Sequence, residues 1–239
     1  MPTALITGAN RGIGLEFARQ LSQAGWKVFA TCRDPDHAEV LHRLASASPP
    51  SIQIHSLDTG DAKSISALSD AVGNQPIDLL ICNAGTSRMK SALITGAEGE
   101  RIQDADDALW FEVFRTNTIG PLRVAAAFAE RVAASERRLM AFLSSHMSVV
   151  ARNKSGASYI YRSSKAALNI IIKNLSIELA PRDVTCIVLH PGWVRTDMGG
   201  AGADVTPEES VSGMLQVLLD AKLPKHIQFL DFRGETVPW

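Results

Sequence analysis

Short apolar runs alternate along this chain with longer segments in which apolar side chains recur at helical spacing. The runs are nearly continuous in apolar residues, as in parallel strands that are covered on both faces. We predict seven strands: Ala4 to Thr7, Lys27 to Cys32, Ile52 to Leu57, Leu79 to Cys82, Leu139 to Leu143, Thr185 to Leu189 and His226 to Phe229. Helical periodicity predicts helices over Gly14 to Ala24, Ala62 to Val72, Asp107 to Ser135, Tyr159 to Ala180 and Pro207 to Asp220.

This alternation predicts an α/β fold with one doubly wound parallel sheet of about seven strands and helices on both faces. No repeat, low-complexity tract or charge block marks a linker, so we expect residues 1–239 to form a single domain. The irregular segment from Thr86 to Glu100 follows a strand end. Because open α/β sheets bind ligands outside the carboxyl ends of their strands, this segment either borders a site or is a solvated connector.

Charge and composition exclude several classes of protein. The 24 Lys and Arg residues against 25 Asp and Glu give a net charge of -1, which disfavours nucleic acid or an anionic membrane as a partner. No apolar stretch reaches the length of about 18 residues that a membrane span needs, and no signal peptide precedes the first strand. We therefore expect a cytoplasmic protein without a metal site, in which three cysteines are reduced core thiols: Cys32, Cys82 and Cys186.

A glycine-rich loop joins the first strand to the first helix. Its glycines, at positions 8, 12 and 14, let the backbone approach a pyrophosphate, and the helix N-terminus that follows offers free N–H groups. The spacing differs from the common Gly-x-Gly-x-x-Gly fingerprint, and the missing Lys-Ser/Thr ending excludes a nucleotide triphosphatase loop. The loop indicates a dinucleotide site, with a purely structural tight turn as the alternative.

The end of the second strand bears on the choice of cofactor. NAD-binding folds usually place an acid there for the ribose 2′-OH, whereas this chain has Cys32 followed by Arg33. A guanidinium pairs well with a 2′-phosphate, and Arg11 in the glycine loop adds a second positive charge. The sequence thus favours NADPH over NADH, unless Arg33 and Asp34 are merely an exposed, solvated pair.

The chain has two tyrosines, Tyr159 and Tyr161, and Tyr161 has a lysine, Lys165, four residues further on. On a helix these two side chains share a face. A phenol with a pKa near ~10 is a poor acid or base at neutral pH, and a nearby ammonium lowers that pKa. The pair is chemically suited to acid–base catalysis, although its spacing alone is common.

Further motifs follow the strand ends in order: Asn83-Ala84-Gly85, Asn117, the serines after the fifth strand, and Pro191-Gly192. With the glycine loop and Tyr161, they make the chain closely resemble the short-chain dehydrogenase/reductase family over essentially its whole length. The stretches HPGWVRTDMGG, FLDFRGETVPW and YRSSKAALN look like those of C-factor-type proteins and sniffer-like carbonyl reductases. The resemblance implies a Rossmann-type domain and an NAD(P)-dependent oxidoreductase.

The resemblance also implies catalytic roles. Tyr161 would protonate the substrate carbonyl oxygen, and Lys165 would hold the nicotinamide ribose and lower the pKa of Tyr161. Asn117 would position a water through its backbone carbonyl, and Ser145 would hydrogen-bond the substrate oxygen. Many relatives place this serine 13 residues before the tyrosine, which is Ser148 here. Strand-end geometry favours Ser145, and Ser148 stays as the alternative.

For the cofactor, the resemblance implies that Asp58 accepts a hydrogen bond from the adenine amino group and that Val194 and Thr196 fix the carboxamide. Each residue also has an ordinary explanation as turn chemistry. The full implied set is Gly8, Asn10, Arg11, Gly12, Ile13, Gly14, Arg33, Asp58, Asn83, Ala84, Gly85, Tyr161, Lys165, Pro191, Gly192, Val194 and Thr196.

We therefore expect NADPH-dependent reduction of a small or medium ketone, aldehyde or quinone. The same residues would serve the opposite reaction, the oxidation of an alcohol. The short GGAGADV segment suggests an open, weakly selective pocket. The resemblance implies a homodimer or homotetramer, and it permits a cofactor-binding signalling or sensor protein as the alternative function. His146 and His190 suggest a Ser-His-Asp hydrolase, but the chain lacks a Gly-x-Ser-x-Gly elbow.

Overall fold

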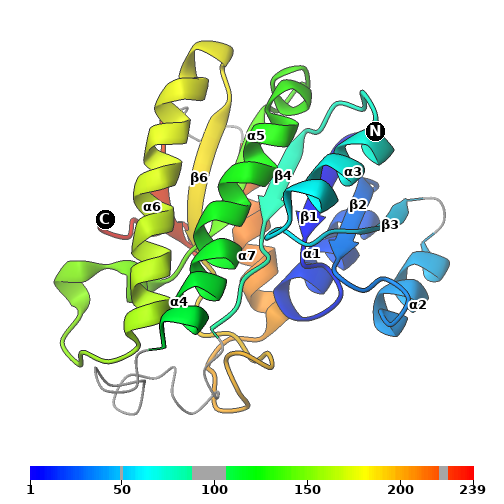
Figure 1. Cartoon of the computed structure of the whole chain (residues 1–239). Coiled ribbons are helices and arrows are strands. Elements are labelled where there is room, and N and C mark those ends of the chain that lie inside the picture. The colour runs from blue at the N-terminus through cyan, green and yellow to red at the C-terminus, as the bar shows by residue number, and fades with distance from the viewer. Residues whose placement is uncertain (49–50, 88–105, 221–225) are drawn as a thin grey trace.

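A computed structural model describes residues 1–48, 51–87, 106–220 and 226–239. Its strands pair in parallel in one seven-stranded sheet of order β3-β2-β1-β4-β5-β6-β7 (Figure 1). The strands are β1 (Thr3–Thr7), β2 (Lys27–Cys32), β3 (Ile52–Ser56), β4 (Leu79–Cys82), β5 (Leu139–Leu143), β6 (Thr185–His190) and β7 (Gln228–Asp231). The predicted α/β fold of Rossmann type is confirmed.

Helices cover both faces of the sheet (Figure 1). They are α1 (Gly12–Gln23), α2 (Glu39–Ala47), α3 (Ala62–Val72), α4 (Asp107–Phe114), α5 (Gly120–Ala133), α6 (Tyr159–Leu179) and α7 (Pro207–Leu219). A π-helical turn, Arg115–Ile119, joins α4 to α5. Short 3-10 turns cover His146–Ser148, Val150–Arg152 and Ala180–Arg182.

Alternate side chains of each strand enter two separate cores, because successive strand residues point to opposite faces of the sheet. In β1, Leu5 packs into the core that α3, α5 and α6 cover. Ala4 and Ile6 pack into the other core, beneath α1, α2 and α7. Burial on both faces explains why the strands read as continuous apolar runs.

Three predictions for the elements need correction. The predicted helix from Asp107 to Ser135 is two α-helices separated by the π-helical turn. Helix α2 is not among the predicted helices; Leu41 is its one fully buried residue, and Leu44 and Ala45 pack against the same core while partly exposed. The last strand begins at Gln228, two residues later than predicted. The predicted irregular segment from Thr86 to Glu100 lies, from residue 88 on, outside the described residues.

The order of the strands reverses at β1, where the chain continues to β2 on one side and, later, to β4 on the other. Ligands of open α/β sheets bind in the crevice at this point, outside the carboxyl ends of the strands. The glycine loop follows β1, and the Asn83-Ala84-Gly85 segment follows β4, so both motifs lie at the crevice. The fold therefore brings the predicted cofactor motifs to one edge of the sheet.

The three cysteines are buried and form no disulfide, which confirms them as core thiols. No helix among the described residues has the length and apolar character that a membrane crossing requires.

Candidate active site

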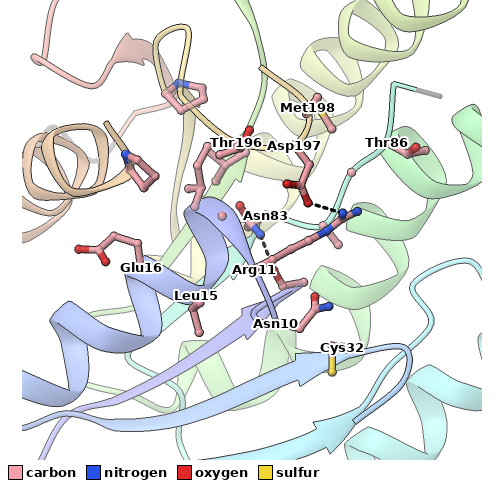
Figure 2. Close-up of a pocket in the computed structure, with 18 of the residues that line it drawn as sticks. Asn10, Arg11, Leu15, Glu16, Cys32, Asn83, Thr86, Thr196, Asp197 and Met198 are labelled. Atoms are coloured by element: carbon pink, nitrogen blue, oxygen red, sulfur yellow. Dashed lines mark hydrogen bonds and ion pairs between the residues drawn. The ribbon is translucent and has the colours of Figure 1, made fainter. Parts of the chain in front are cut away.

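A cavity of about 680 Å³ opens at the carboxyl ends of the central strands (Figure 2). Most of the predicted site residues line it: Gly8, Asn10, Arg11, Gly12, Ile13, Arg33, Asp58, Asn83, Ala84, Gly85, Tyr161, Lys165, Pro191 and Thr196. The other predicted residues do not: Gly14, Asn117, Ser145, Gly192 and Val194. One cavity thus joins the glycine loop to the tyrosine and lysine of α6.

The glycine loop is held against the loop after β4. A Cβ on Gly14 would overlap the Gly8 carbonyl oxygen, so this position requires glycine. The side-chain amide of Asn83 donates to the carbonyls of Thr7 and Gly8, at 2.9 and 3.0 Å. Asn83 therefore fixes the path of the loop, a role that the sequence analysis missed.

The end of β2 carries no acid at the cavity. Cys32 is buried and lines the cavity, and burial raises the pKa of its thiol, so the group is uncharged at neutral pH. Arg33 is exposed and also lines the cavity. On the next strand end, Asp58 Oδ1 accepts a hydrogen bond from Gly60 N at 2.8 Å, which orients the carboxylate. The end of β2 therefore presents an arginine and an uncharged thiol to the cavity, which suits an anionic ligand better than an acidic residue would.

Tyr161 and Lys165 lie buried in the first turns of α6, with 8% and 5% of their surfaces exposed. Lys165 Nζ donates to the Leu143 carbonyl at 2.8 Å and lies 5.9 Å from the centre of the Tyr161 ring. Burial raises the pKa of Tyr161 to about 12 and lowers that of Lys165 to about 8. The structure thus differs from the expected lowering of the tyrosine pKa, because desolvation of the phenolate dominates.

The two candidate serines have different surroundings. The Ser145 side chain acts on that of Tyr161 and opposes the rise in the tyrosine pKa, while its Oγ accepts a hydrogen bond from Met147 N at 3.1 Å. Ser148 instead donates to the Ser145 carbonyl at 2.6 Å and accepts from Asn169 Nδ2 at 2.9 Å. The structure therefore brings Ser145 to the tyrosine, while Ser148 supports the backbone of the loop.

Asn117 lies in the π-helical turn and is completely buried. Its Oδ1 accepts from Thr86 N, and its Nδ2 donates to Thr86 O, both at 2.8 Å. Nδ2 also donates to Ser164 Oγ at 3.1 Å. The sequence predicts a role for the Asn117 backbone carbonyl and gives no sign of these side-chain bonds, which tie the loop after β4 to α6.

Two histidines connect the loop after β5 to the end of β6. The rings of His146 and His190 stack with their centres 3.7 Å apart, and His146 N donates to His190 Nδ1 at 3.3 Å. Burial, His146 and Arg152 together lower the pKa of His190 to about 3. The pair thus joins the residue after Ser145 to the residue before Pro191, and both adjoin the candidate site.

The structure adds residues to the cavity wall that the sequence did not suggest, among them Asp197 and Met198 after β6. Within the described ranges, no cluster of three His, Cys, Asp or Glu side chains is arranged to hold a metal ion.

Comparison with known proteins places the chain in a family. A sequence model described as short chain dehydrogenase matches residues 2–205. C-signal of Myxococcus xanthus is 40% identical over 174 residues, which are 72% of this chain and 99% of that protein.

Two solved carbonyl reductases match over the whole fold. The NADPH-bound enzyme from chicken fatty liver has a TM-score of 0.89 at 35% identity, with 100% of this chain and 99% of that chain covered. Sniffer of D. melanogaster has a TM-score of 0.87 at 29% identity, with both chains fully covered. These similarities confirm the predicted likeness to C-factor-type and sniffer-like proteins. The chain belongs to the short chain dehydrogenase family of NAD(P)-dependent oxidoreductases.

Proposed function

We propose that this protein reduces the carbonyl group of a ketone, aldehyde or quinone to an alcohol, with NADPH as the reductant and Tyr161 as the general acid. The observation that carries the proposal is the position of Tyr161 and Lys165, which lie buried four residues apart in α6 on the wall of the cavity that the glycine loop also lines. The carbonyl reductases from chicken fatty liver and D. melanogaster, which share the fold at 35% and 29% identity, support the same chemistry.

The cavity suits a dinucleotide phosphate. Its volume of about 680 Å³ falls within the range of about 300–1,000 Å³ typical of ligand pockets. The glycine loop and the N-terminus of α1 offer backbone N–H groups to a diphosphate. Arg11 and Arg33 on the wall, with the neutral Cys32 at the end of β2, favour a 2′-phosphate over a free ribose hydroxyl. Bound NADPH supplies the hydride.

Tyr161 supplies the proton that the carbonyl oxygen needs as its carbon is reduced. With a pKa raised to about 12, the phenol carries its proton at neutral pH but is a weak acid, so its transfer to the substrate depends on the nearby charge of Lys165. Ser145, whose side chain acts on that of Tyr161, donates to the same substrate oxygen and so stabilises the negative charge that develops there. The alkoxide that forms as the carbonyl is reduced therefore gains its proton from the phenol, without free hydronium.

Lys165 holds the nicotinamide ribose. Its ammonium is bound to the Leu143 carbonyl at 2.8 Å and has further N–H donors for ribose hydroxyls. The positive charge also eases the loss of the Tyr161 proton in the transition state. The proton that the site consumes is replaced through a water molecule that the backbone carbonyl of Asn117 would position. The π-helical turn supports this role, since π-helical turns inside α-helices occur frequently at functional sites.

The loop after β6 frames the nicotinamide. Pro191 and Thr196 line the cavity, and the Thr196 hydroxyl also contacts the Val194 carbonyl, at 3.4 Å. Gly192 and Val194 lie behind this surface, so they act through the backbone path of the loop.

A homodimer or homotetramer with one domain per chain completes the proposal. Every described strand belongs to one sheet, which supports a single domain over residues 1–239. Large apolar side chains are exposed on α4 and α6, namely Phe111, Ile170 and Ile177, and burial in a subunit contact would remove them from water.

A second candidate function is signalling in which the cofactor is bound and catalysis is incidental. The observation in its favour is the 40% identity to C-signal. The buried Tyr161 and Lys165, with the polar bonds that hold them, favour the enzyme, since a mere binding protein has no need of them.

Turnover separates the two functions. The purified protein is mixed with NADPH and a panel of ketones, aldehydes and quinones, and nicotinamide absorbance is followed. We expect steady oxidation of NADPH with several members of the panel. Tight binding of NADPH without oxidation by any member would contradict the reductase and favour signalling.

A further inference from the structure

Arg11 and Asp197 form an ion pair across the cavity between residues 186 positions apart in the sequence. Arg11 Nη1 lies 2.6 Å from Asp197 Oδ2. Figure 2 shows the pair bridging the glycine loop and the loop after β6, with the Arg11 side chain directed toward the Asp197 carboxylate. The pair therefore spans the part of the cavity where we place the phosphate groups of the cofactor.

The two loops that carry this pair are in contact. A Cβ built on Gly12 would lie 3.2 Å from Thr196 Cγ2. Asp197 belongs to a turn in which the N–H groups of Gly199 and Gly200 donate to Thr196, at 3.2 Å to Oγ1 and 2.8 Å to the carbonyl. The turn thus presents the carboxylate to Arg11 from a defined position.

Solvent makes the ion pair easy to exchange. The two side chains are 69% and 75% exposed, and water screens pairs of this kind so that they contribute little to stability. A phosphate offers a guanidinium more acceptor oxygens and more charge than one carboxylate does. A phosphate that reaches Arg11 will therefore replace Asp197 as its partner.

The other arginines of the wall are less available. Arg19 Nε donates to Glu16 at 2.7 Å, and Arg195 Nε donates to the Ala203 carbonyl at 2.8 Å. Arg33 makes no ion pair with the described part of the chain. Arg11 and Arg33 are thus the arginines suited to a 2′-phosphate, and Asp197 competes for one of them.

We propose that Asp197 sets how strongly this protein prefers the 2′-phosphorylated cofactor, because it holds Arg11 until the phosphate displaces it. This inference rests on the proposed binding of NADPH. Asp197 then lowers the affinity for NADPH, whereas the affinity for NADH, which has no 2′-phosphate, changes little. Without the carboxylate charge, Arg11 can bind the 2′-phosphate without first breaking its ion pair with Asp197.

The test compares dissociation constants for NADPH and NADH, measured by nicotinamide fluorescence, in the wild type, Asp197→Asn, Arg11→Ala and the double variant. The matched control is Glu208→Gln, which removes one negative charge from an exposed position on the same cavity wall. We expect Asp197→Asn to tighten NADPH binding about threefold, an effect typical of an exposed ion pair, and to leave NADH unchanged. Glu208→Gln should have a smaller effect.

Each other result has a definite meaning. In the Arg11→Ala background, Asp197→Asn should no longer tighten NADPH binding, since the two residues act as a pair. Equal tightening there, or in Glu208→Gln, would overturn the inference in favour of general charge repulsion. Unchanged or weaker NADPH binding by Asp197→Asn would overturn it as well. Failure of the wild type to bind NADPH would overturn the proposed function and the inference with it.

Discussion

Asn117 Nδ2 donates a hydrogen bond of 3.1 Å to Ser164 Oγ, one position before Lys165 in α6. The same side chain makes two bonds of 2.8 Å to the backbone of Thr86, in the loop after β4. Ser164 in turn donates to the Tyr161 carbonyl at 2.8 Å. One buried amide therefore connects the π-helical turn, a wall of the cavity and the helix that carries Tyr161 and Lys165.

Replacement of Asn117 by alanine removes all three of these bonds within a completely buried site. We expect Asn117→Ala to lower the free energy of unfolding by about 2–4 kcal/mol, because buried polar groups lose their partners. Urea denaturation measures the change. The control is Asn174→Ala, on the exposed face of α6, which should stay within about 0.5 kcal/mol of the wild type. Equal stability of both variants would contradict this account of Asn117.

The entry to α6 stores backbone strain. Ala157 and Ser158 both have left-handed φ values, 56° and 55°. The Ser158 hydroxyl is buried and has no hydrogen-bond partner among the described residues. Ser158→Gly relieves the strain and removes the unpaired group, at some cost in chain entropy. We expect a gain of about 1 kcal/mol in unfolding free energy, measured by urea denaturation.

Gly156 allows the reverse test, in which a glycine with a positive φ is replaced by a residue that has a side chain. Its φ is 65°, and a Cβ there would meet no atom within 4 Å, so Gly156→Ala tests the backbone conformation alone. We expect a loss of about 1 kcal/mol. A loss of stability in Ser158→Gly as well would mean that the serine side chain contributes more than the strain costs.

His190 makes the fold sensitive to acid. Its pKa is lowered to about 3 in the folded chain, against 6.5 for an ordinary histidine. Between these values the unfolded chain binds the proton that the folded chain excludes, so stability falls as the pH drops below about 6.5. From pH 6.5 to pH 5 the loss from this group is on the order of 2 kcal/mol.

His190→Asn keeps an acceptor for the His146 N–H but cannot bind this proton. We therefore expect the difference in urea midpoint between pH 7 and pH 5 to be clearly smaller in His190→Asn than in the wild type. His42→Asn, at an exposed position, should keep the full difference. The same acid sensitivity in both variants would assign it to other groups.

The proposed preference for NADPH depends chiefly on Arg33. Arg33→Ala should weaken NADPH binding about tenfold, since a charge-assisted bond to a phosphate is lost, and should leave NADH binding unchanged. Parallel titrations by nicotinamide fluorescence measure both constants. Arg43→Ala removes the same charge from an exposed position on α2 that does not line the cavity, and should change neither. Equal weakening of NADPH and NADH by Arg33→Ala would assign the arginine a role unrelated to the 2′-phosphate.

Much of the fold could be predicted from local pattern. The strands β2, β4 and β5 begin and end as predicted, because parallel strands buried on both faces leave an unbroken apolar run. The tyrosine and lysine of α6 could be paired from their spacing together with the motifs at the strand ends, since residues four apart share a helix face.

What could not be predicted depends on contacts between distant segments. The π-helical turn at Asn117 shifts a helix by one residue, which is too little for apolar periodicity to reveal. Ser145 and Ser148 are close in sequence, and they are distinguished by the hydrogen bond of Asn169 to Ser148 and by the influence of Ser145 on the pKa of Tyr161. The pairing of Arg11 with Asp197 requires the fold itself, because it joins loops that follow different strands.

The central claim is that Tyr161 gives its proton to the substrate, and the two tyrosines of the chain provide the test with its own control. NADPH oxidation with a ketone, aldehyde or quinone is measured for Tyr161→Phe and for Tyr159→Phe, which lies two residues away and is 42% exposed. We predict a loss in kcat of at least about 10²-fold in Tyr161→Phe, with NADPH affinity retained, and a nearly unchanged rate in Tyr159→Phe. A Tyr161→Phe variant that binds NADPH and reduces the carbonyl at the wild-type rate would contradict the account.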